Sequence, residues 1–112
     1  MAMATKVNLV VDQGTHFTTN VTLTNDDGTA FDLTDYSAAS QIKKHYTSSN
    51  ATNVTVTLGG NTGVMTLTMN NYTTSTFSAG RYVYDVELTD PDGVISRIVE
   101  GIVTISPQVT TS

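Results

Sequence analysis

The sequence GRYVYDVELTDPDGVISRIVEGIVTI, from Gly80 to Ile105, predicts two long β-strands joined by one tight turn. Its first half alternates apolar and more polar residues, the period-two pattern of a strand with one buried face. The apolar members are Tyr82, Tyr84, Val86 and Leu88. The segment Asp90-Pro91-Asp92-Gly93 has the residues of a type I turn closed by a left-handed glycine. The second strand ends before Pro107, which cannot donate a ladder hydrogen bond.

The turn chemistry also predicts the pairing of the two strands. With Gly93 in the left-handed bulge position, Asp90 pairs with Val94. Counting outward places Glu87 opposite Arg97, Val86 opposite Ile98, and Val83 opposite Gly101. We expect Glu87 and Arg97 to form a surface ion pair that helps to fix the register. Because Gly101 lies inside a strand, we also expect a bulge or a close backbone approach there.

Shorter strands with turn residues between them precede this hairpin. The patterns predict strands over 6–11, 17–24, 30–33, 37–46, 54–58 and 65–69, and glycine-rich or Asp-rich turns separate several of them. Residues 37–46 could also form a short helix, because Ala and Lys favour one, but the neighbouring strands favour a strand. Seven or eight short strands at regular spacing predict an all-β fold, an immunoglobulin-like antiparallel β-sandwich.

Residues 70–79 interrupt the strand pattern and predict one short helical turn near 71–78. We expect Tyr72 and Phe77 to close one end of the core, with Gly80 stopping the helix. The expected core consists of Val21, Leu23, Leu33, Val56, Leu67, Tyr82, Val86 and Ile98.

The length of 112 residues predicts one domain over 1–112, with 1–5 and 108–112 as extended tails. The chain has no Cys, only 13% charged residues and a net charge of −5, and its polar surface is rich in Thr. Five basic residues are too few and too scattered for nucleic-acid binding. No apolar run is long enough to cross a membrane as a helix, and the N-terminus lacks the plan of a secretory signal.

No residue pattern here predicts catalysis, a cofactor or a metal site. His16 and His45 lie in different segments, and no nucleophile motif is present. Asp85 and Glu87 share a strand face at a spacing that carboxylate catalysis could use, but Arg97 across the hairpin favours a structural ion pair. Neither Asp-rich turn has the ligand spacing of an EF-hand. The residues singled out are therefore structural: Gly80, Tyr82, Tyr84, Glu87, Gly93, Arg97 and Gly101.

Several stretches resemble small β-sandwich virion proteins of tailed bacteriophages, similar to the N-terminal domain of phage baseplate upper proteins. The resembling stretches are Phe17–Leu23, Asp27–Thr34, Ala79–Thr89 and Glu100–Ile105, followed by Pro107 and Val109-Thr110. The run AGRYVYDVEL, then a turn and an Arg-x-x-x-Gly-x-Val strand, is the most specific part.

The resemblance implies a non-enzymatic structural subunit of a virion, present in many copies and docked onto other virion proteins in the tail or baseplate. Because the chain ends at Ser112, we expect an adaptor or decoration role without a receptor-binding domain. A capsid-decorating protein on the phage head is an alternative. A carbohydrate-binding adhesion module is another, although such modules usually expose aromatic residues and this chain has no Trp.

The sequence also suggests where such a protein could dock. Two strands, KVNLVV at 6–11 and VTVTL at 54–58, carry little of the charge, proline or bulge that protects exposed sheet edges. Either could add to a neighbouring subunit's sheet. The interface candidates are Lys6, Val7, Leu9, Val54 and Val56.

Overall fold

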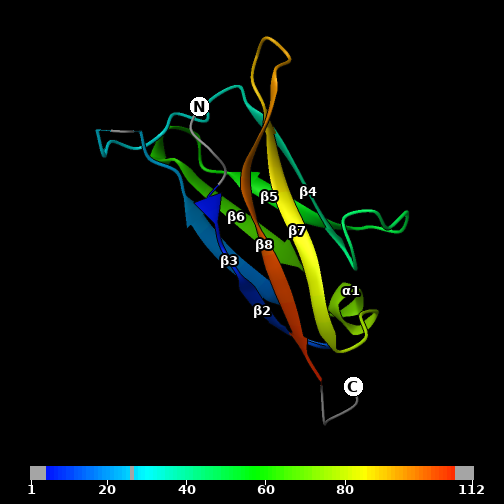
Figure 1. Ribbon diagram of the computed structural model, residues 1–112. Helices are drawn as coiled ribbons and strands as arrows, with labels where there is room; N and C mark the ends of the chain where they lie inside the picture. Colours follow the sequence, from blue (N-terminus) through cyan, green and yellow to red (C-terminus); the bar gives the residue numbers. More distant parts are fainter. Residues whose placement is uncertain (1–4, 26, 108–112) are drawn as a thin grey trace.

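The computed structural model describes residues 5–25 and 27–107, which form a two-layered, all-β structure (Figure 1). The described strands make one sheet in the order β1-β8-β7-β4-β5-β6-β3, and β2 also pairs with β8. Their bounds are β1 Thr5–Lys6, β2 Leu9–Asp12, β3 Phe17–Thr22, β4 Ser37–Lys43, β5 Thr52–Leu58, β6 Val64–Met69, β7 Gly80–Thr89 and β8 Ile95–Ser106. A 3₁₀ turn, η1 (Gly60–Thr62), and a short helix, α1 (Asn71–Ser75), complete the list.

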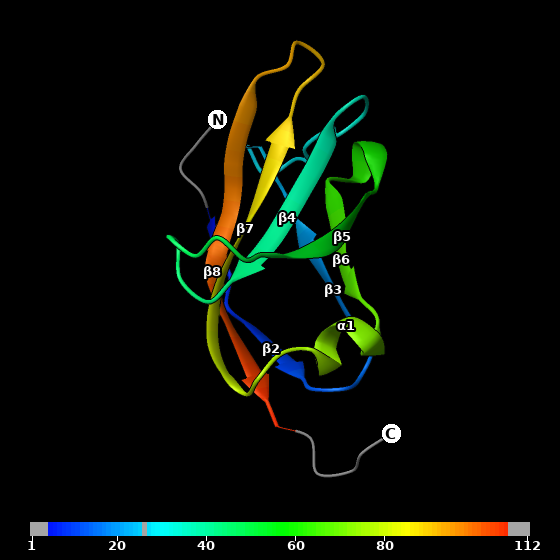
Figure 2. The same ribbon diagram turned by 90° about the vertical axis from the view of Figure 1, so that its right-hand side faces the viewer.

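Strand β5 carries the sheet from one layer into the other. Its first residues, Thr52 to Val54, pair with β4, whereas Thr55 to Leu58 pair with β6. One layer therefore contains β1, β2, β8, β7 and β4, and the other contains β6 and β3 (Figure 2). The apolar faces of the two layers meet in the middle, which is how a sandwich removes apolar surface from water.

The N-terminal strand differs from its prediction in two ways. It is split into β1 and β2, with Val7 and Asn8 between them, and both pieces pair parallel to β8. The sheet is therefore mixed and not purely antiparallel. Apolar alternation predicted a strand correctly, but it contains no information on the direction of its partner.

The turn end of the β7–β8 hairpin is as predicted. The Asp90 N–H donates to the Val94 carbonyl at 3.0 Å, and Gly93 has a φ of 89°. The Asp90 carboxylate also accepts from the backbone N–H groups of Asp92 and Val94, each at 2.9 Å. Glu87 lies opposite Arg97, as the turn predicts.

Beyond that pair the predicted register is wrong by one residue. The ladder shifts at a bulge between Val86 and Glu87, so Val86 pairs with Val99 and Val83 pairs with Ile102. Ile98 and Val99 are consecutive and both buried, which a regular strand with only one face in the core does not allow. The bulge lets both apolar side chains reach the core. Gly101 consequently lies opposite Tyr84.

Five of the expected core residues are buried in the sandwich: Val21, Leu33, Leu67, Val86 and Ile98. The other three, Leu23, Val56 and Tyr82, are partly exposed and pack against the core. The predicted alternation along β7 is also observed, with Tyr84, Val86 and Leu88 at most 2% exposed. The sequence therefore identified the correct faces of these strands.

Helix α1 closes one end of the sandwich and confirms the predicted helical turn (Figure 2). The Asn70 side chain caps it by accepting from the Thr73 N–H at 2.9 Å. Phe77 is buried, as expected, but Tyr72 is 77% exposed and takes no part in closing the core. Buried Thr74 points inward instead and donates to the Thr15 carbonyl at 2.7 Å. Thr74, and not Tyr72 as predicted, is therefore buried with Phe77 at this end of the core.

Two further predicted segments differ in their outcome. Residues 37–46 contain strand β4 and not a helix, but the strand ends at Lys43 and residues 44–46 lie in the loop after it. Buried Ser40 donates to the Asp85 carbonyl of β7 at 2.7 Å. Residues 30–33 form only an isolated bridge, between Ala30 and Thr24, and not a strand. Gly80 does not stop α1, which ends at Ser75 with Thr76 as its C-cap. Gly80 instead opens β7 with a φ of 137°. The expected tails at 1–5 and 108–112 lie, apart from Thr5 in β1, outside the described residues.

Candidate functional site

In the described part of the chain, the side chains that could act in catalysis or bind a metal ion do not lie together. His16 and His45 are both exposed and lie in separate loops. Across 5–25 and 27–107, His, Asp and Glu form no group of three able to hold a metal ion. Among the same residues no helix is long and apolar enough to span a bilayer.

The carboxylates of Asp27 and Asp32 accept hydrogen bonds from residues of their own turns. Asp27 accepts from the Thr29 hydroxyl and N–H at 2.6 and 3.0 Å, and these hydrogen bonds lower its pKa. Asp32 accepts from the Thr34 N–H at 3.0 Å, and its bonds to Thr34 likewise lower its pKa. Such side-chain-to-backbone bonds are ordinary turn chemistry.

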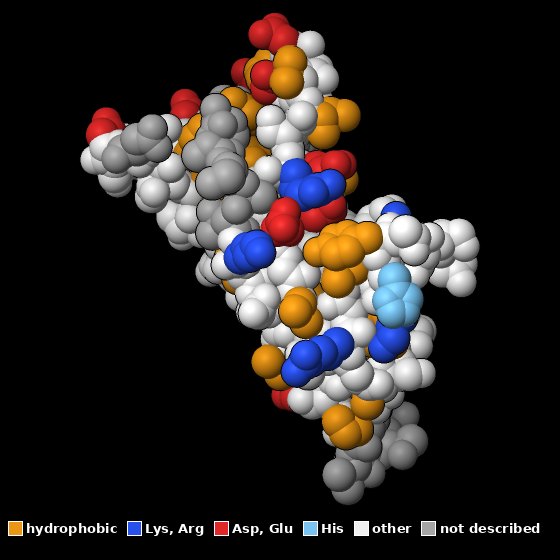
Figure 3. All heavy atoms as spheres, viewed as in Figure 1, with side chains coloured by type: hydrophobic (Ala, Val, Ile, Leu, Met, Phe, Trp, Pro, Cys, Tyr) orange, Lys and Arg blue, Asp and Glu red, His pale blue; other side chains and the backbone are white. Residues whose placement is uncertain are grey.

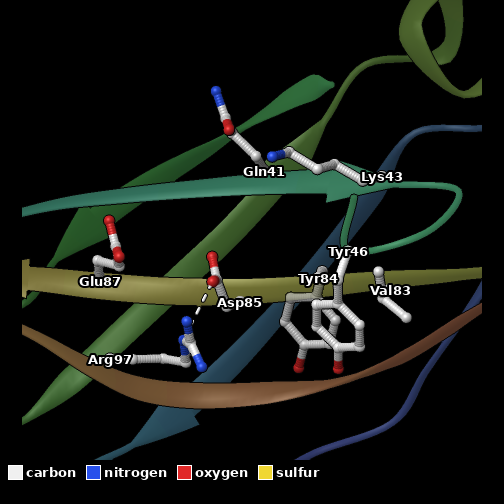
Figure 4. Close-up of a pocket in the computed structure, with 8 residues that line it drawn as sticks. All are labelled: Gln41, Lys43, Tyr46, Val83, Tyr84, Asp85, Glu87 and Arg97. Atoms are coloured by element: carbon white, nitrogen blue, oxygen red, sulfur yellow. Dashed lines mark ion pairs between the residues drawn. The ribbon is translucent and has the colours of Figure 1, made fainter. Parts of the chain in front are cut away.

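An ion cluster lies on the outer face of the β7–β8 ribbon. Arg97 Nε lies 3.2 Å from Asp85 Oδ2, and Arg97 Nη1 lies 3.8 Å from Glu100 Oε1. Glu87 is directly opposite Arg97 and on the same face, but it is not the ion-pair partner that we expected (Figure 4). The guanidinium reaches diagonally across the hairpin to Asp85. At this degree of exposure the pair contributes about 0–1 kcal/mol.

Beside this cluster is a shallow hollow of about 300 Å³, which we call the β4–β7–β8 hollow. It is lined by Gln41, Lys43, Tyr46, Val83, Tyr84, Asp85, Glu87 and Arg97 (Figure 4). Tyr46, in the loop after β4, is 63% exposed. On the face seen in Figure 3, most acidic side chains lie in the upper half and most basic ones in the middle and lower half, with apolar side chains between them.

Several contacts fix the gap between β1 and β2 to β7 and β8, and we call them the N-terminal clamp. The buried Tyr84 hydroxyl donates to the Val7 carbonyl at 2.6 Å, and burial raises the pKa of Tyr84 to about 12. The Asn8 side chain accepts from the Ile102 N–H at 3.1 Å. A side chain at Gly101 would overlap the Val7 carbonyl, so only glycine fits. The close approach expected at Gly101 is therefore confirmed.

The remaining structural residues have clear positions. Tyr82 is half-buried; its ring meets Phe77 edge-on at 5.0 Å, and its hydroxyl donates to the Ser78 carbonyl at 2.9 Å. The Lys44 ammonium lies 4.6 Å from the centre of the Tyr82 ring. A wider depression of about 450 Å³ adjoins these residues, between the loops at 48–52 and 76–78.

The interface candidates are divided by the structure. β1 and β2 lie at a margin of the sheet, as expected, with Lys6 exposed and Leu9 turned into the core. The second candidate edge is wrong, because β5 lies inside the sheet between β4 and β6. Val54 and Val56 face the core. The other margin is β3, which pairs only with β6 in the described structure.

Sequence reasoning missed the most exposed apolar side chains. Val10 is 67% exposed on β2, and Tyr46 and Tyr72 are 63% and 77% exposed. Alternation identifies Val10, because its neighbours Leu9 and Val11 face inward. No such signal exists for Tyr46, because it lies in a loop whose path depends on tertiary packing.

Comparison with known proteins identifies a fold and no family. No family model matches the chain, and no curated protein matches it. Among solved structures, an internalin-like protein of Listeria monocytogenes is similar, with a TM-score of 0.52 and 17% sequence identity. The match covers 92% of this chain but 28% of that one. At this identity the similarity shows a shared fold.

Proposed function

We propose that this protein is a non-enzymatic structural module of a tailed-phage virion, docked in many copies in the tail or baseplate. The sequence resemblance supports this function, and its most specific stretches form β7 and most of the paired part of β8. The fold suits the role, because a β-sandwich with satisfied buried polar groups is rigid without a ligand. In the described residues no buried side-chain nitrogen or oxygen is without a partner.

The observation that carries the docking model is the position of β1 and β2 at a margin of the sheet. A margin presents unpaired backbone groups that a strand of another subunit can extend. Val10 projects from this margin with 67% of its surface exposed. The break at Val7 and Asn8 divides the margin into two short pieces, which limits indiscriminate pairing.

The location of the chain in purified particles tests the proposal. Mass spectrometry of purified virions, followed by cryo-electron microscopy, should find it in the tail or baseplate in symmetric copies. Finding it on the capsid surface would favour the head-decorating alternative. Its absence from particles would overturn both.

A pair of variants tests the docking margin itself. Val10→Lys places a charge on the exposed β2 surface, and Val94→Lys does the same at the hairpin turn, where Val94 is 59% exposed. We expect Val10→Lys to reduce incorporation into particles severalfold, with Val94→Lys incorporated normally and both variants folded. Equal incorporation of the two would exclude β2 as the docking margin.

A further inference from the structure

Tyr46 gives the β4–β7–β8 hollow an aromatic wall. Tyr46 is 63% exposed, although folding usually buries much of a tyrosine. In Figure 4 the Tyr46 ring lies on the same side of the sheet as Asp85, Val83 and Lys43. A flat apolar surface therefore stands next to hydrogen-bonding groups.

The polar groups of the hollow can bind hydroxyls in both directions. Carboxylates accept, the ammonium donates, and an amide does both. The Glu87 side chain has no hydrogen-bond or ion-pair partner among the described residues, so its two carboxylate oxygens are available. Gln41 uses its N–H group to bind Asn53 at 3.1 Å, which leaves its carbonyl oxygen as an acceptor.

The charges of the hollow cancel. Lys43 and Arg97 contribute two positive charges, and Asp85 and Glu87 contribute two negative ones, so the formal sum is zero. Arg97 is already paired with Asp85 at 3.2 Å and with Glu100, just outside the hollow, at 3.8 Å. A strongly charged ligand gains little here, because each attractive group has a repulsive one close by.

We propose that this hollow binds a neutral saccharide. A pyranose ring has an apolar face of C–H groups that can pack on Tyr46, and hydroxyls around its rim that can both donate and accept. Glu87 and Gln41 accept from those hydroxyls, and Lys43 donates to them. The volume of about 300 Å³ is at the small end for ligand pockets, which suits one or two sugar units. This activity goes beyond a structural role and does not depend on it.

Titration of the whole labelled protein, followed by amide NMR, tests this site. The probes are cellotetraose, maltotetraose and chitotetraose, with tetragalacturonic acid as the charged comparison. We expect at least one neutral probe to saturate with a Kd of roughly 0.1–10 mM, as for weak small-ligand sites. The shifted amides should lie around residues 41–46 and 83–87, and the charged probe should bind less well.

Two tyrosine variants decide whether Tyr46 makes the site. Tyr46→Ala should weaken binding by about tenfold or more, the loss expected when one stacking surface is removed. Tyr72→Ala is the matched control, because Tyr72 is also exposed but lies on α1, and it should leave affinity within about twofold. Tyr46→Phe should retain most of the binding.

The results that overturn the proposal are equally definite. They are no saturable shift with any neutral probe at about 20 mM, equal affinity in the Tyr46→Ala variant, or shifts centred away from the hollow. None of these would affect the virion proposal, which depends on the location of the chain in particles.

Discussion

The two ends of the β7–β8 ribbon are held together by different kinds of contact. At the turn end, Asp90 and Gly93 bond within the turn, and the apolar Val94 and Ile95 are exposed. At the far end, Gly101 and Ile105 are buried beside the N-terminal strand, which pairs with β8 although Val11 and Ile105 are 94 residues apart in sequence. The turn end is stabilised by contacts between residues close in sequence and is exposed to solvent. The far end is stabilised by contacts between residues distant in sequence and is buried.

The difference explains why one register prediction succeeded and the other failed. Local turn chemistry fixes pairing out to Glu87 and Arg97. Beyond it, burial of both Ile98 and Val99 outweighs continuous pairing and inserts a bulge. Hydrogen bonding decides the register near the turn, and core packing decides it farther away.

One substitution made at both ends should give the largest contrast. Ile105 is 1% exposed and Ile95 is 62% exposed. Ile105→Ala should lower the free energy of unfolding by about 2–5 kcal/mol, through lost burial and a cavity. Ile95→Ala should change it by less than about 0.5 kcal/mol. Urea unfolding of both variants measures the difference, and similar losses would show that the two ends are equally packed.

A second contrast uses glycine. Gly101→Ala would drive a Cβ into the Val7 carbonyl, so the N-terminal strand or β8 must shift, at a cost of about 2–4 kcal/mol. Gly93→Ala meets nothing within 4 Å and bears only the cost of its positive φ, about 1 kcal/mol. Hydrogen exchange should show faster exchange of β1 and β2 amides in Gly101→Ala alone. Unchanged exchange there would contradict the N-terminal clamp.

The third contrast is in pH dependence. Burial raises the pKa of Tyr84 to about 12 from 10.0, so above pH 10 the unfolded chain loses this proton while the folded chain keeps it. Stability that is fully present below pH 10 is therefore lost as pH rises to about 12. The full shift corresponds to about 2–3 kcal/mol.

Tyr84→Phe isolates this contribution. At neutral pH the variant should be less stable by about 1–2 kcal/mol, because the Val7 carbonyl loses its partner. That deficit should shrink and then reverse between pH 10 and pH 12. A deficit independent of pH would mean that the hydroxyl is solvated in the folded protein. Tyr82→Phe, which removes a more exposed hydroxyl, is the control.

Much of the fold follows from the sequence because period-two alternation and turn residues act locally. They predicted the strand faces, the helical turn and strand β4 in preference to a helix. They could not predict the parallel pairing of β1 and β2, or the interior position of β5, because both depend on which strands meet in space. The burial of Thr74 in place of Tyr72 likewise depends on a carbonyl, that of Thr15, from a distant loop.

The candidate site was less predictable for the same reason. Glu87 and Arg97 were correctly placed opposite each other, yet the ion pair forms between Arg97 and Asp85. Tyr46 was predicted as the last residue of a strand over 37–46, but β4 ends at Lys43, and the exposure of Tyr46 results from the path of the loop that follows. Sequence patterns supplied the strand faces, and only the assembled sheet placed the side chains of three strands around one hollow.

The smallest expected effect tests the diagonal ion pair at the boundary between the two ends. Double-mutant cycles of Arg97 with Asp85 and of Arg97 with Glu87, each to Ala, measure the two couplings separately. The Arg97 Nε to Asp85 Oδ2 distance of 3.2 Å predicts a coupling of about 0.2–1 kcal/mol that weakens in high salt. Glu87 has no such contact and should couple by less than about 0.2 kcal/mol, although it lies directly opposite. Stronger coupling to Glu87 would mean that Arg97 interacts mainly with the carboxylate directly opposite it in the ladder, and not with Asp85, which lies diagonally across the hairpin. In that case the bulge between Val86 and Glu87 would not affect which surface charges pair. The pairing set by the turn would then reach farther along the ribbon than the structure indicates.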